Sequence, residues 1–435
     1  MINEKVTIYW FRRDLRVHDN KGLYHALKGS NKVVPIFIFD TQIINTLAKD
    51  DARISFIYSA LGSINDAMKK NRCNVGMYLG NPEAVFLKII NDFSVEKVVT
   101  NRDYEPYSTE RDSIVEKLLS KHDILFETYK DHVIFEKSEI TKNNGEPYVV
   151  YTPYSNKWLK KFRNKDIKRC HSEDYLNQLY NSNRLPNLEL KDIGFNHSAF
   201  SYPNYQFNDK IITNYQSTRD YPSLDKTSKV GPHIRFGTLS IRELAIKSSY
   251  NKNNTFLKEL IWREFFMQIL WHYPFTKLKC FKSKYEKIKW RNDEEEFEKW
   301  CTGNTGYPIV DAGMRELNST GFMHNRVRMI VGSFLCKHLL IDWRWGELYF
   351  SKKLLDYEQS SNVGNWQWVA GCGVDAAPYF RIFNPSEQVK KFDKDFKYIK
   401  KWVPEFQELS YPEPLVDHKF ARQRCLDIYK YYLNN

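Results

Sequence analysis

The chain has 435 residues, enough for two or three domains with a large buried core. Its 66 lysines and arginines against 53 acidic residues give a formal net charge of +13, and 15% of the residues are aromatic. This composition favours an acidic binding partner, and nucleic acid is the leading candidate because of the many aromatic residues. A generally lysine-rich proteome is the alternative explanation for the charge.

The sequence also argues against several classes of protein. No apolar run is long enough to span a bilayer, and the amino terminus lacks a signal peptide's apolar segment, so we expect no membrane partner. The seven scattered cysteines form no CxxC pair, which predicts reduced thiols in a cytoplasmic protein. The eleven histidines do not combine with cysteine in a finger-like pattern, so we expect no metal site.

The first 130 residues alternate β-rich runs with helical patterns. Five runs are typical of strands: 6–11, 33–40, 74–80, 97–104 and 124–130. Segments 52–70 and 82–93 carry the 3.6-residue apolar period of helices. The alternation predicts a parallel, doubly wound sheet, and the lack of GxGxxG after the first strand argues against a classical dinucleotide site.

The rest of the chain changes character twice. Residues 131–205 hold turn-rich pieces and a basic helix candidate at 156–169, and we interpret them as a long interdomain connection. From residue 206 strand signals nearly vanish, and amphipathic helices continue to residue 435. We therefore expect an α/β domain over 1–130, the connection over 131–205 and an all-α domain over 206–435.

One loop of the second half is suited to phosphate. Residues 227–231 (TSKVG) offer hydroxyls, a cation and free backbone amides just ahead of a predicted helix, and this combination favours a pyrophosphate. An ordinary Ser/Thr-rich loop is the alternative.

Two predicted helices carry unusual faces. Spacings of three and four place Glu259, Trp262, Arg263 and Phe266 on one face, which makes a poor core stripe and a good receptor for a flat base with amide edges. In the second helix, Asn325 and Met329 lie one turn apart, with Arg328 beside them.

The segment 362–385 holds Trp366 and Trp368 in a tract of Gly, Ala and Asn, just after an acidic approach at 356–358. Small residues beside flat rings indicate a site for another flat ring. A core turn with two packed indoles is the alternative, and we expect Trp368 to point away from Trp366 by pleat or turn alternation.

The segment 10–20 (WFRRDLRVHDN) and the segment 362–385 resemble class I cyclobutane pyrimidine dimer photolyases of the photolyase/cryptochrome family, and the resemblance covers essentially the whole chain. It implies FAD in the helical domain and, when one is present, an accessory pigment in the α/β domain. The residues that match FAD contacts are Tyr215, Thr227, Ser228, Lys229, Val230, Gly231, Phe256, Arg263, Arg328, Asp356, Tyr357, Glu358 and Asn362.

Some of these positions depart from the family. Lys229 and Gly231 stand where relatives commonly have Arg and Ser, and Phe256 replaces a tryptophan seen in some relatives. Tyr357 and Glu358 replace Gly and Asp, which adds bulk beside the expected flavin ring.

The resemblance also implies roles toward the substrate. It gives catalytic roles to Glu259, Asn325, Met329 and Asn362, with Asn362 near flavin N5. It implies DNA contacts at Arg219, Glu259, Trp262, Arg263, Phe266, Asn325, Arg326, Trp368 and Gln388, and an electron relay through Trp366, Trp343 and Trp290. Asn325 and Met329 are the residues of the dimer-repairing branch, because both are histidines in the (6-4) branch.

The accessory pigment stays open. Tyr107 and Ser108 stand near the positions of the Asn-Glu pair expected of a folate antenna, so a deazaflavin, a flavin or an empty pocket are the alternatives.

The implied activity is light-driven splitting of cyclobutane pyrimidine dimers, by electron transfer from photoexcited reduced FAD to a flipped-out dimer in DNA. The protein is then a lyase that acts as a monomer in the cytoplasm, at the nucleoid. A signalling cryptochrome is the main competitor, although the chain ends at Asn435 without the tail that such members usually carry. A nucleic-acid-binding module without catalysis is the third option, and it leaves Asp356, Asn362 and the 227–231 loop unexplained.

Overall fold

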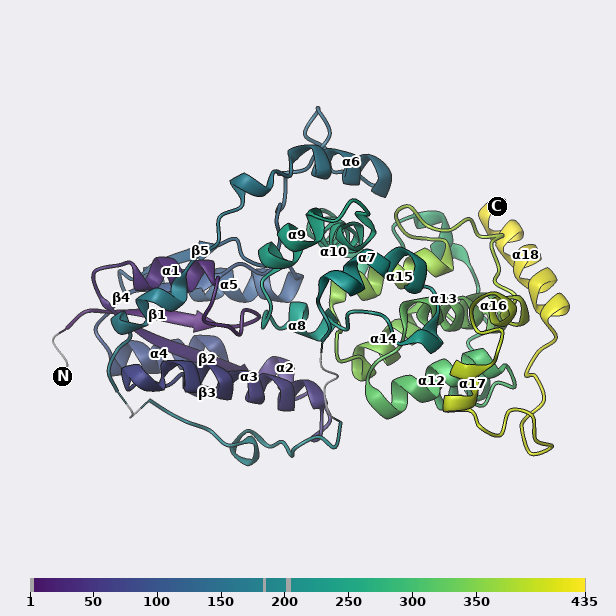
Figure 1. Cartoon of the computed structure of the whole chain (residues 1–435), viewed down its shortest axis with the longest axis horizontal. Coiled ribbons are helices and arrows are strands. Elements are labelled where there is room, and N and C mark those ends of the chain that lie inside the picture. The colour runs from purple at the N-terminus through teal and green to yellow at the C-terminus, as the bar shows by residue number, and fades with distance from the viewer. Residues whose placement is uncertain (1–3, 183–184, 201–204, 435) are drawn as a thin grey trace. The chain divides into compact units, whose positions relative to one another are not determined.

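The computed structural model describes residues 4–182, 185–200 and 205–434 (Figure 1). By contact the chain forms two compact units: unit 1 comprises residues 1–139, 160–203 and 230–250, and unit 2 comprises 140–159, 204–229 and 251–435. None of the helices in the described residues is long and apolar enough to cross a membrane.

Unit 1 is built on a five-stranded, all-parallel sheet in the order β3-β2-β1-β4-β5. Its strands are β1 (Val6–Phe11), β2 (Lys32–Asp40), β3 (Gly76–Gly80), β4 (Val95–Asn101) and β5 (Leu125–Tyr129). Its helices are α1 (Lys21–Leu27), α2 (Thr41–Ile44), α3 (Ala52–Met68), α4 (Pro82–Asp92), α5 (Pro106–Ser120), α8 (Gly231–Arg235) and α9 (Ile241–Ser249). The predicted doubly wound α/β fold is confirmed, with strand bounds close to those expected.

Both faces of the sheet are covered, as the apolar character of the strands requires. Tyr9 and Phe11 of β1 pack in a core with side chains of α1 and α3, whereas Ile8 and Trp10 pack in a second core with side chains of α4 and α5. The period of two along β1 therefore places alternate side chains on opposite faces.

Unit 2 is helical, which confirms the predicted all-α part. Its helices are α7 (Asp209–Thr218), α10 (Thr255–His272), α11 (Glu294–Thr302), α12 (Pro308–Thr320), α13 (Asn325–Ser333), α14 (Trp343–Lys353), α15 (Gln359–Ala370), α16 (Pro385–Phe392), α17 (Lys397–Trp402) and α18 (His418–Asn434). A π-helical turn, Phe334–Leu339, follows α13. Helix α6 (Tyr151–Lys161) spans the division between the units, since its last two residues belong to unit 1 by contact.

The expected boundaries at 130 and 205 cut the chain into consecutive segments, whereas contacts within the structure group separate segments together. Residues 140–159 and 204–229 pack with the helical unit, and residues 160–203 and 230–250 pack with the sheet. A division of the chain into domains at 130 and 205 stays a prediction.

Candidate active site

A pocket of unit 2 gathers residues that are far apart in the sequence. Helix α13, helix α15 and the turn 354–358 that precedes α15 supply most of its lining. Eight predicted site residues lie in this lining: Asn325, Arg328, Met329, Asp356, Tyr357, Glu358, Asn362 and Trp366, together with Trp368 as a predicted DNA contact.

Asp356 presents an unsatisfied acceptor at this pocket. The guanidinium of Arg328 donates to its Oδ2 atom at 3.0 Å, and the Arg328 Nε–H donates to the carbonyl of Met323 at 2.8 Å. The other oxygen, Oδ1, is buried without a hydrogen-bond partner among the described residues. A buried acceptor of this kind is costly unless a ligand N–H satisfies it.

Asn362 is fixed by a residue that the sequence analysis missed. Its Nδ2 donates to the Oε1 atom of Glu347 at 2.9 Å and to the Glu347 carbonyl at 3.1 Å. Burial raises the pKa of Glu347. The Oδ1 atom of Asn362 accepts no hydrogen bond within the described residues, so it is available to a ligand. Glu347 lies fifteen residues before Asn362 on another helix, and no spacing rule connects the two.

The two residues that depart from the family pattern have protein partners. Glu358 is buried and accepts from Arg263 Nε at 2.8 Å. The Tyr357 hydroxyl lies 3.5 Å from Oε1 of Glu347. The ion pair between Arg263 and Glu358 thus links α10 to the start of α15. This structural contact accounts for Arg263 and Glu358 without a ligand.

The predicted face of α10 divides into two parts. Phe266 is buried, and a Cβ added at Gly364 of α15 would lie 2.2 Å from its ring, so Phe266 packs in the core. Trp262 is half-buried and stacks on Tyr151 of α6, with ring centroids 3.6 Å apart and ring planes within 5°. Tyr151 falls in the segment that we interpreted as a connection, and nothing in the sequence pairs it with Trp262.

Glu259 and Arg219, two predicted DNA contacts, form an ion pair with each other. Burial raises the pKa of the Glu259 carboxyl, and Arg219 opposes this shift. Arg219 also lies over the Tyr215 ring, 5.4 Å from its centroid. Contact of either residue with DNA therefore requires this ion pair to open or to be shared.

The predicted phosphate loop straddles the division between the units. Tyr215 contacts Phe256 edge-to-face at 5.0 Å, and Lys229, at φ 54°, pairs with Asp225 at 2.8 Å. Ser228 is buried, and its carbonyl accepts from the Gln206 N–H. Thr227 belongs to unit 2 with these residues, whereas Val230 and Gly231 belong to unit 1, and the helix that Gly231 opens has five residues.

Helix α13 places Asn325 and Met329 in the lining of the pocket, and their role toward a substrate stays a prediction. His324 caps the helix by accepting the Arg326 N–H at Nδ1, and burial lowers the pKa of His324 to about 4, so the ring is neutral at pH 7. The Arg326 guanidinium pairs with Asp220 at 2.7 Å and lies 4.4 Å from the centroid of the Phe392 ring.

The segment around Trp366 and Trp368 is helical, so the prediction of a turn or pleat was wrong. Both residues lie on α15, where two positions correspond to roughly 200° of rotation, and this separates their side chains. The helix ends at Gly371, whose φ of 93° favours glycine. Gln388 lies half-buried on α16.

The three predicted relay residues differ in their surroundings. Trp366 is buried, with its ring centroid 6.2 Å from that of Trp300. Trp343 is fully buried, and its Nε1–H has no partner among the described residues. Trp290 is half-buried and contacts Tyr429 edge-to-face at 6.0 Å. A ring contact between Trp366 and Trp343 does not occur in the part of the chain that the structure describes, so the relay stays a prediction.

In unit 1, the predicted antenna positions are occupied by internal contacts. The Tyr107 hydroxyl donates to Asp40, and Ser108 donates to Asp103. Arg111 lies over both Trp10 and Tyr107. The absence of the folate pair from these positions leaves the pigment undetermined.

Comparison with known proteins agrees with this arrangement. The family model described as DNA photolyase matches residues 7–172, and the one described as FAD binding domain of DNA photolyase matches residues 256–410. A deoxyribodipyrimidine photo-lyase of Alkalihalophilus pseudofirmus is 33% identical, over 98% of this chain and 98% of its own length.

Solved structures extend the likeness to three dimensions. A bacterial class III photolyase from Agrobacterium tumefaciens superposes with a TM-score of 0.89 at 30% identity, covering 100% of this chain and 99% of its own. An archaeal photolyase from Sulfolobus tokodaii, described with two FAD molecules and an implied novel light-harvesting cofactor, gives a TM-score of 0.84 at 33% identity, covering 98% of this chain and 100% of its own. On full-length identity, both family models and the shared fold, this chain belongs to the DNA photolyase family.

Proposed function

We propose that the protein splits cyclobutane pyrimidine dimers in DNA in a light-dependent reaction that uses reduced FAD as electron donor. The observation that carries this proposal is one pocket that brings together Asp356, whose Oδ1 lacks a partner among the described residues, and Asn362, whose amide is held by Glu347. Asn325, Met329 and Trp368 line the same pocket. Asp356 and Asn362 would hold the edge of a flavin ring, and Asn325, Met329 and Trp368 would contact a pyrimidine dimer.

The pocket residues fit FAD. Asp356 Oδ1 lacks a donor, and the N–H groups at the edge of an isoalloxazine ring are donors. Asn362, held by Glu347, would present its carbonyl oxygen to the ring with little freedom to rotate. Tyr215, Phe256 and the loop 227–231 would hold the remainder of the cofactor. When bound and reduced, FAD supplies an electron donor that blue light excites.

The substrate side of the site is proposed to accept a flipped-out dimer. Flipping costs a few kcal/mol, and least for a damaged pair that already stacks badly. Trp262, which stacks on Tyr151 and contacts Phe266 at 5.5 Å, is proposed to stack on one base, and Trp368 in the pocket lining adds a second indole. Stacking of about 1–3 kcal/mol per base offsets the cost of flipping.

Glu259 is proposed to hydrogen bond to the thymine edge. Its raised pKa increases the protonated fraction of the carboxyl at any given pH, and a protonated carboxyl can donate to a carbonyl oxygen. Arg219, released from its pair with Glu259, would then contact a DNA phosphate. Arg326, once its pair with Asp220 opens, and Gln388 would contact further phosphates. The positive charge of the chain supports such phosphate contacts.

The remaining assignments belong to the same proposal. Trp366, Trp343 and Trp290 would carry an electron from the surface when oxidised flavin is photoreduced. The chain would act as a monomer in the cytoplasm, at the nucleoid, with residues 1–130 as antenna domain and 206–435 as catalytic domain.

The deciding experiment separates repair from signalling. FAD-loaded, chemically reduced protein is illuminated with blue light in the presence of an oligonucleotide that contains one cyclobutane dimer or one (6-4) product. Recovery of the undamaged bases from the dimer only is expected, given Asn325 and Met329. A protein that binds FAD and photoreduces, yet repairs neither lesion, would be a photoreceptor instead.

A further inference from the structure

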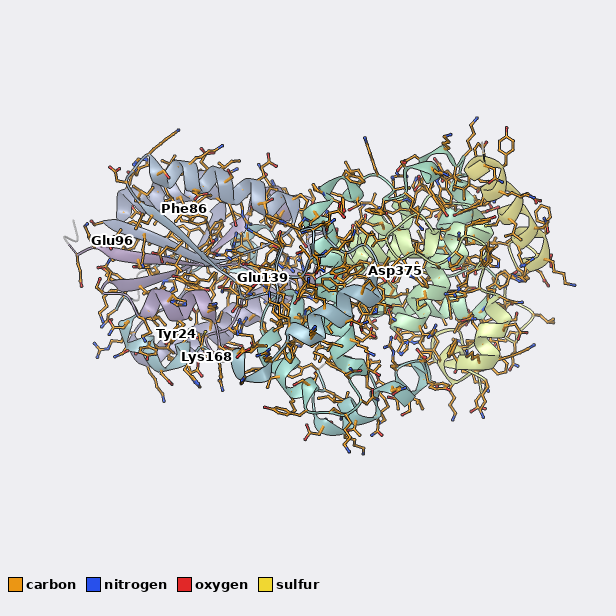
Figure 2. The ribbon with its side chains drawn as sticks, turned by 90° about the horizontal axis from the view of Figure 1, so that it is seen from above. Tyr24, Phe86, Glu96, Glu139, Lys168 and Asp375 are labelled. Atoms are coloured by element: carbon orange, nitrogen blue, oxygen red, sulfur yellow. The ribbon has the colours of Figure 1, made fainter. Side chains whose placement is uncertain are left out.

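Unit 1 contains a large cavity that neither the FAD site nor the predicted antenna positions use. It is lined by residues of α1, of the segment 130–135 after β5, of the end of α6 and of the segment 163–170, and by Arg242 of α9. Its volume is about 750 Å³, within the range of small-molecule sites. Tyr24 and Lys168, both labelled in Figure 2, line it.

The lining is strongly basic. Eight cationic side chains line the cavity against one carboxylate, Asp166. Four of the eight are engaged by the protein: Arg242 pairs with Asp19 and Asp131, Arg169 with Glu173 and Glu243, Lys130 with Glu139, and Lys161 donates to the Glu139 carbonyl. Arg242, Arg169 and Lys130 are therefore neutralised by carboxylates, whereas Lys161, held by a carbonyl, keeps its positive charge.

The other four cations are Lys21, Lys160, Arg163 and Lys168. Their side chains make neither an ion pair nor a hydrogen bond with any residue that the structure describes. Lys160, Arg163 and Lys168 are exposed at the rim, and Lys21 is half-buried. Four free cations against the single Asp166 leave a local excess of three positive charges, which favours a polyanion.

The aromatic rings of the lining contact other side chains of the protein. Phe135 has Lys161 5.0 Å and Lys130 5.8 Å from its ring centroid, and the Tyr24 ring contacts Tyr175 and Lys28. These rings already contact cations or another ring, whereas the four free cations have no partner among the described residues, so an anion would satisfy groups that nothing else satisfies. The cavity therefore suits a negatively charged ligand.

We propose that this cavity binds a chain of phosphate groups, either free polyphosphate or the triphosphate of a nucleotide. Arginine matches the geometry of phosphate oxygens with paired N–H donors, and lysines add point charges that tolerate several spacings. A hollow with free cations around its rim can contact successive phosphates from several sides. This site is independent of dimer repair, because no residue of the FAD pocket lines it.

The test is calorimetric titration of the FAD-loaded, full-length protein with tripolyphosphate, ATP and adenosine at low and moderate salt. Tripolyphosphate and ATP should bind, with affinity falling as salt rises, and adenosine should not bind. Equal affinity for the two would assign recognition to the phosphate chain alone, whereas tighter ATP binding would assign it to a nucleotide.

Variants locate the site. The double substitution Lys160→Gln, Lys168→Gln should weaken binding of either ligand by about tenfold or more, because two charged contacts are lost. Lys165→Gln removes an exposed lysine of the same segment that does not line the cavity, and it should leave the affinity unchanged.

Three results would overturn the proposal. They are the absence of binding by tripolyphosphate and ATP, an equal loss of affinity in Lys165→Gln, and a Lys160- and Lys168-dependent affinity for undamaged duplex DNA without any for tripolyphosphate. The last result would make the surface a nucleic-acid contact. Dimer repair measured on the same variants should stay at the parent level, so failure of this proposal and of the repair function are distinguishable.

Discussion

Replacement of Tyr151 tests whether the substrate face of Trp262 depends on the ring behind it. Tyr151 is buried, stacks on Trp262 at 3.6 Å, and its hydroxyl donates to the Lys258 carbonyl at 2.8 Å. In Tyr151→Leu the indole keeps its contacts with Phe265 and Phe266 but loses the parallel ring. It therefore gains rotational freedom, which stacking on a base must remove again.

The expected size follows from the contact. An aromatic pair contributes about 0.5–1.5 kcal/mol beyond its area burial, so the affinity for dimer-containing DNA should fall by about twofold to tenfold. The smaller side chain should also lower the free energy of unfolding by about 2 kcal/mol. Tyr151→Phe keeps the ring, loses about 1 kcal/mol of stability with the hydroxyl, and should bind damage as the parent does.

Fluorescence anisotropy with dimer-containing and undamaged oligonucleotides measures the effect, and photoreduction of bound FAD reports on an intact pocket. The loss should be specific to damaged DNA, because only a flipped base reaches the indole. If Tyr151→Leu binds damage normally while Trp262→Leu does not, Trp262 is oriented by other contacts and the reasoning is refuted.

Three further outcomes are expected. Trp366→Phe should keep FAD, photoreduce slowly with an external reductant, and still repair after chemical reduction; photoreduction at the parent rate would remove Trp366 from the relay. The pKa of His324 is about 4 in the folded protein against 6.5 ordinarily, so the unfolded chain binds the extra proton between these values and stability falls as pH drops from 6.5 to 4. His324→Asn keeps an N-cap acceptor but cannot take up this proton. The fall in the free energy of unfolding between pH 7 and pH 4.5, measured by denaturant unfolding, should therefore be about 2–3 kcal/mol smaller in the variant. An equal fall in both proteins would mean that another group titrates. Arg219→Ala should reduce the salt dependence of DNA binding by about one unit, with Lys165→Ala as unchanged control, and an unchanged slope would mean that Arg219 stays paired with Glu259.

The sequence predicted those parts of the molecule whose signals are local. Strand β1 was found within its bounds because a continuous apolar run between polar residues is typical of a strand buried on both faces. Asn325 and Met329 were placed together correctly because one helical turn separates them.

Long-range contacts and competing conformations account for what was missed. Tyr151 and Trp262, or Glu347 and Asn362, meet only because separate helices pack against each other, and a single sequence carries no signal for this. The Gly- and Asn-rich segment before Gly371 suggested a turn by propensity, yet it forms α15 because burial of Trp366 and Asn362 outweighs weak intrinsic preference.

The close packing of α14 and α15 against aromatic rings limits which residues can replace the glycines of these helices. An alanine at Gly346 would put its methyl carbon 2.1 Å from the Trp366 ring, and one at Gly364 would lie 2.2 Å from the Phe266 ring. Glycine to alanine inside a helix ordinarily stabilises by about 1 kcal/mol, but here the sign should reverse. A saturation library selected for survival after ultraviolet exposure should therefore be depleted at these two positions as strongly as at Asp356, although neither glycine offers a side chain to any ligand.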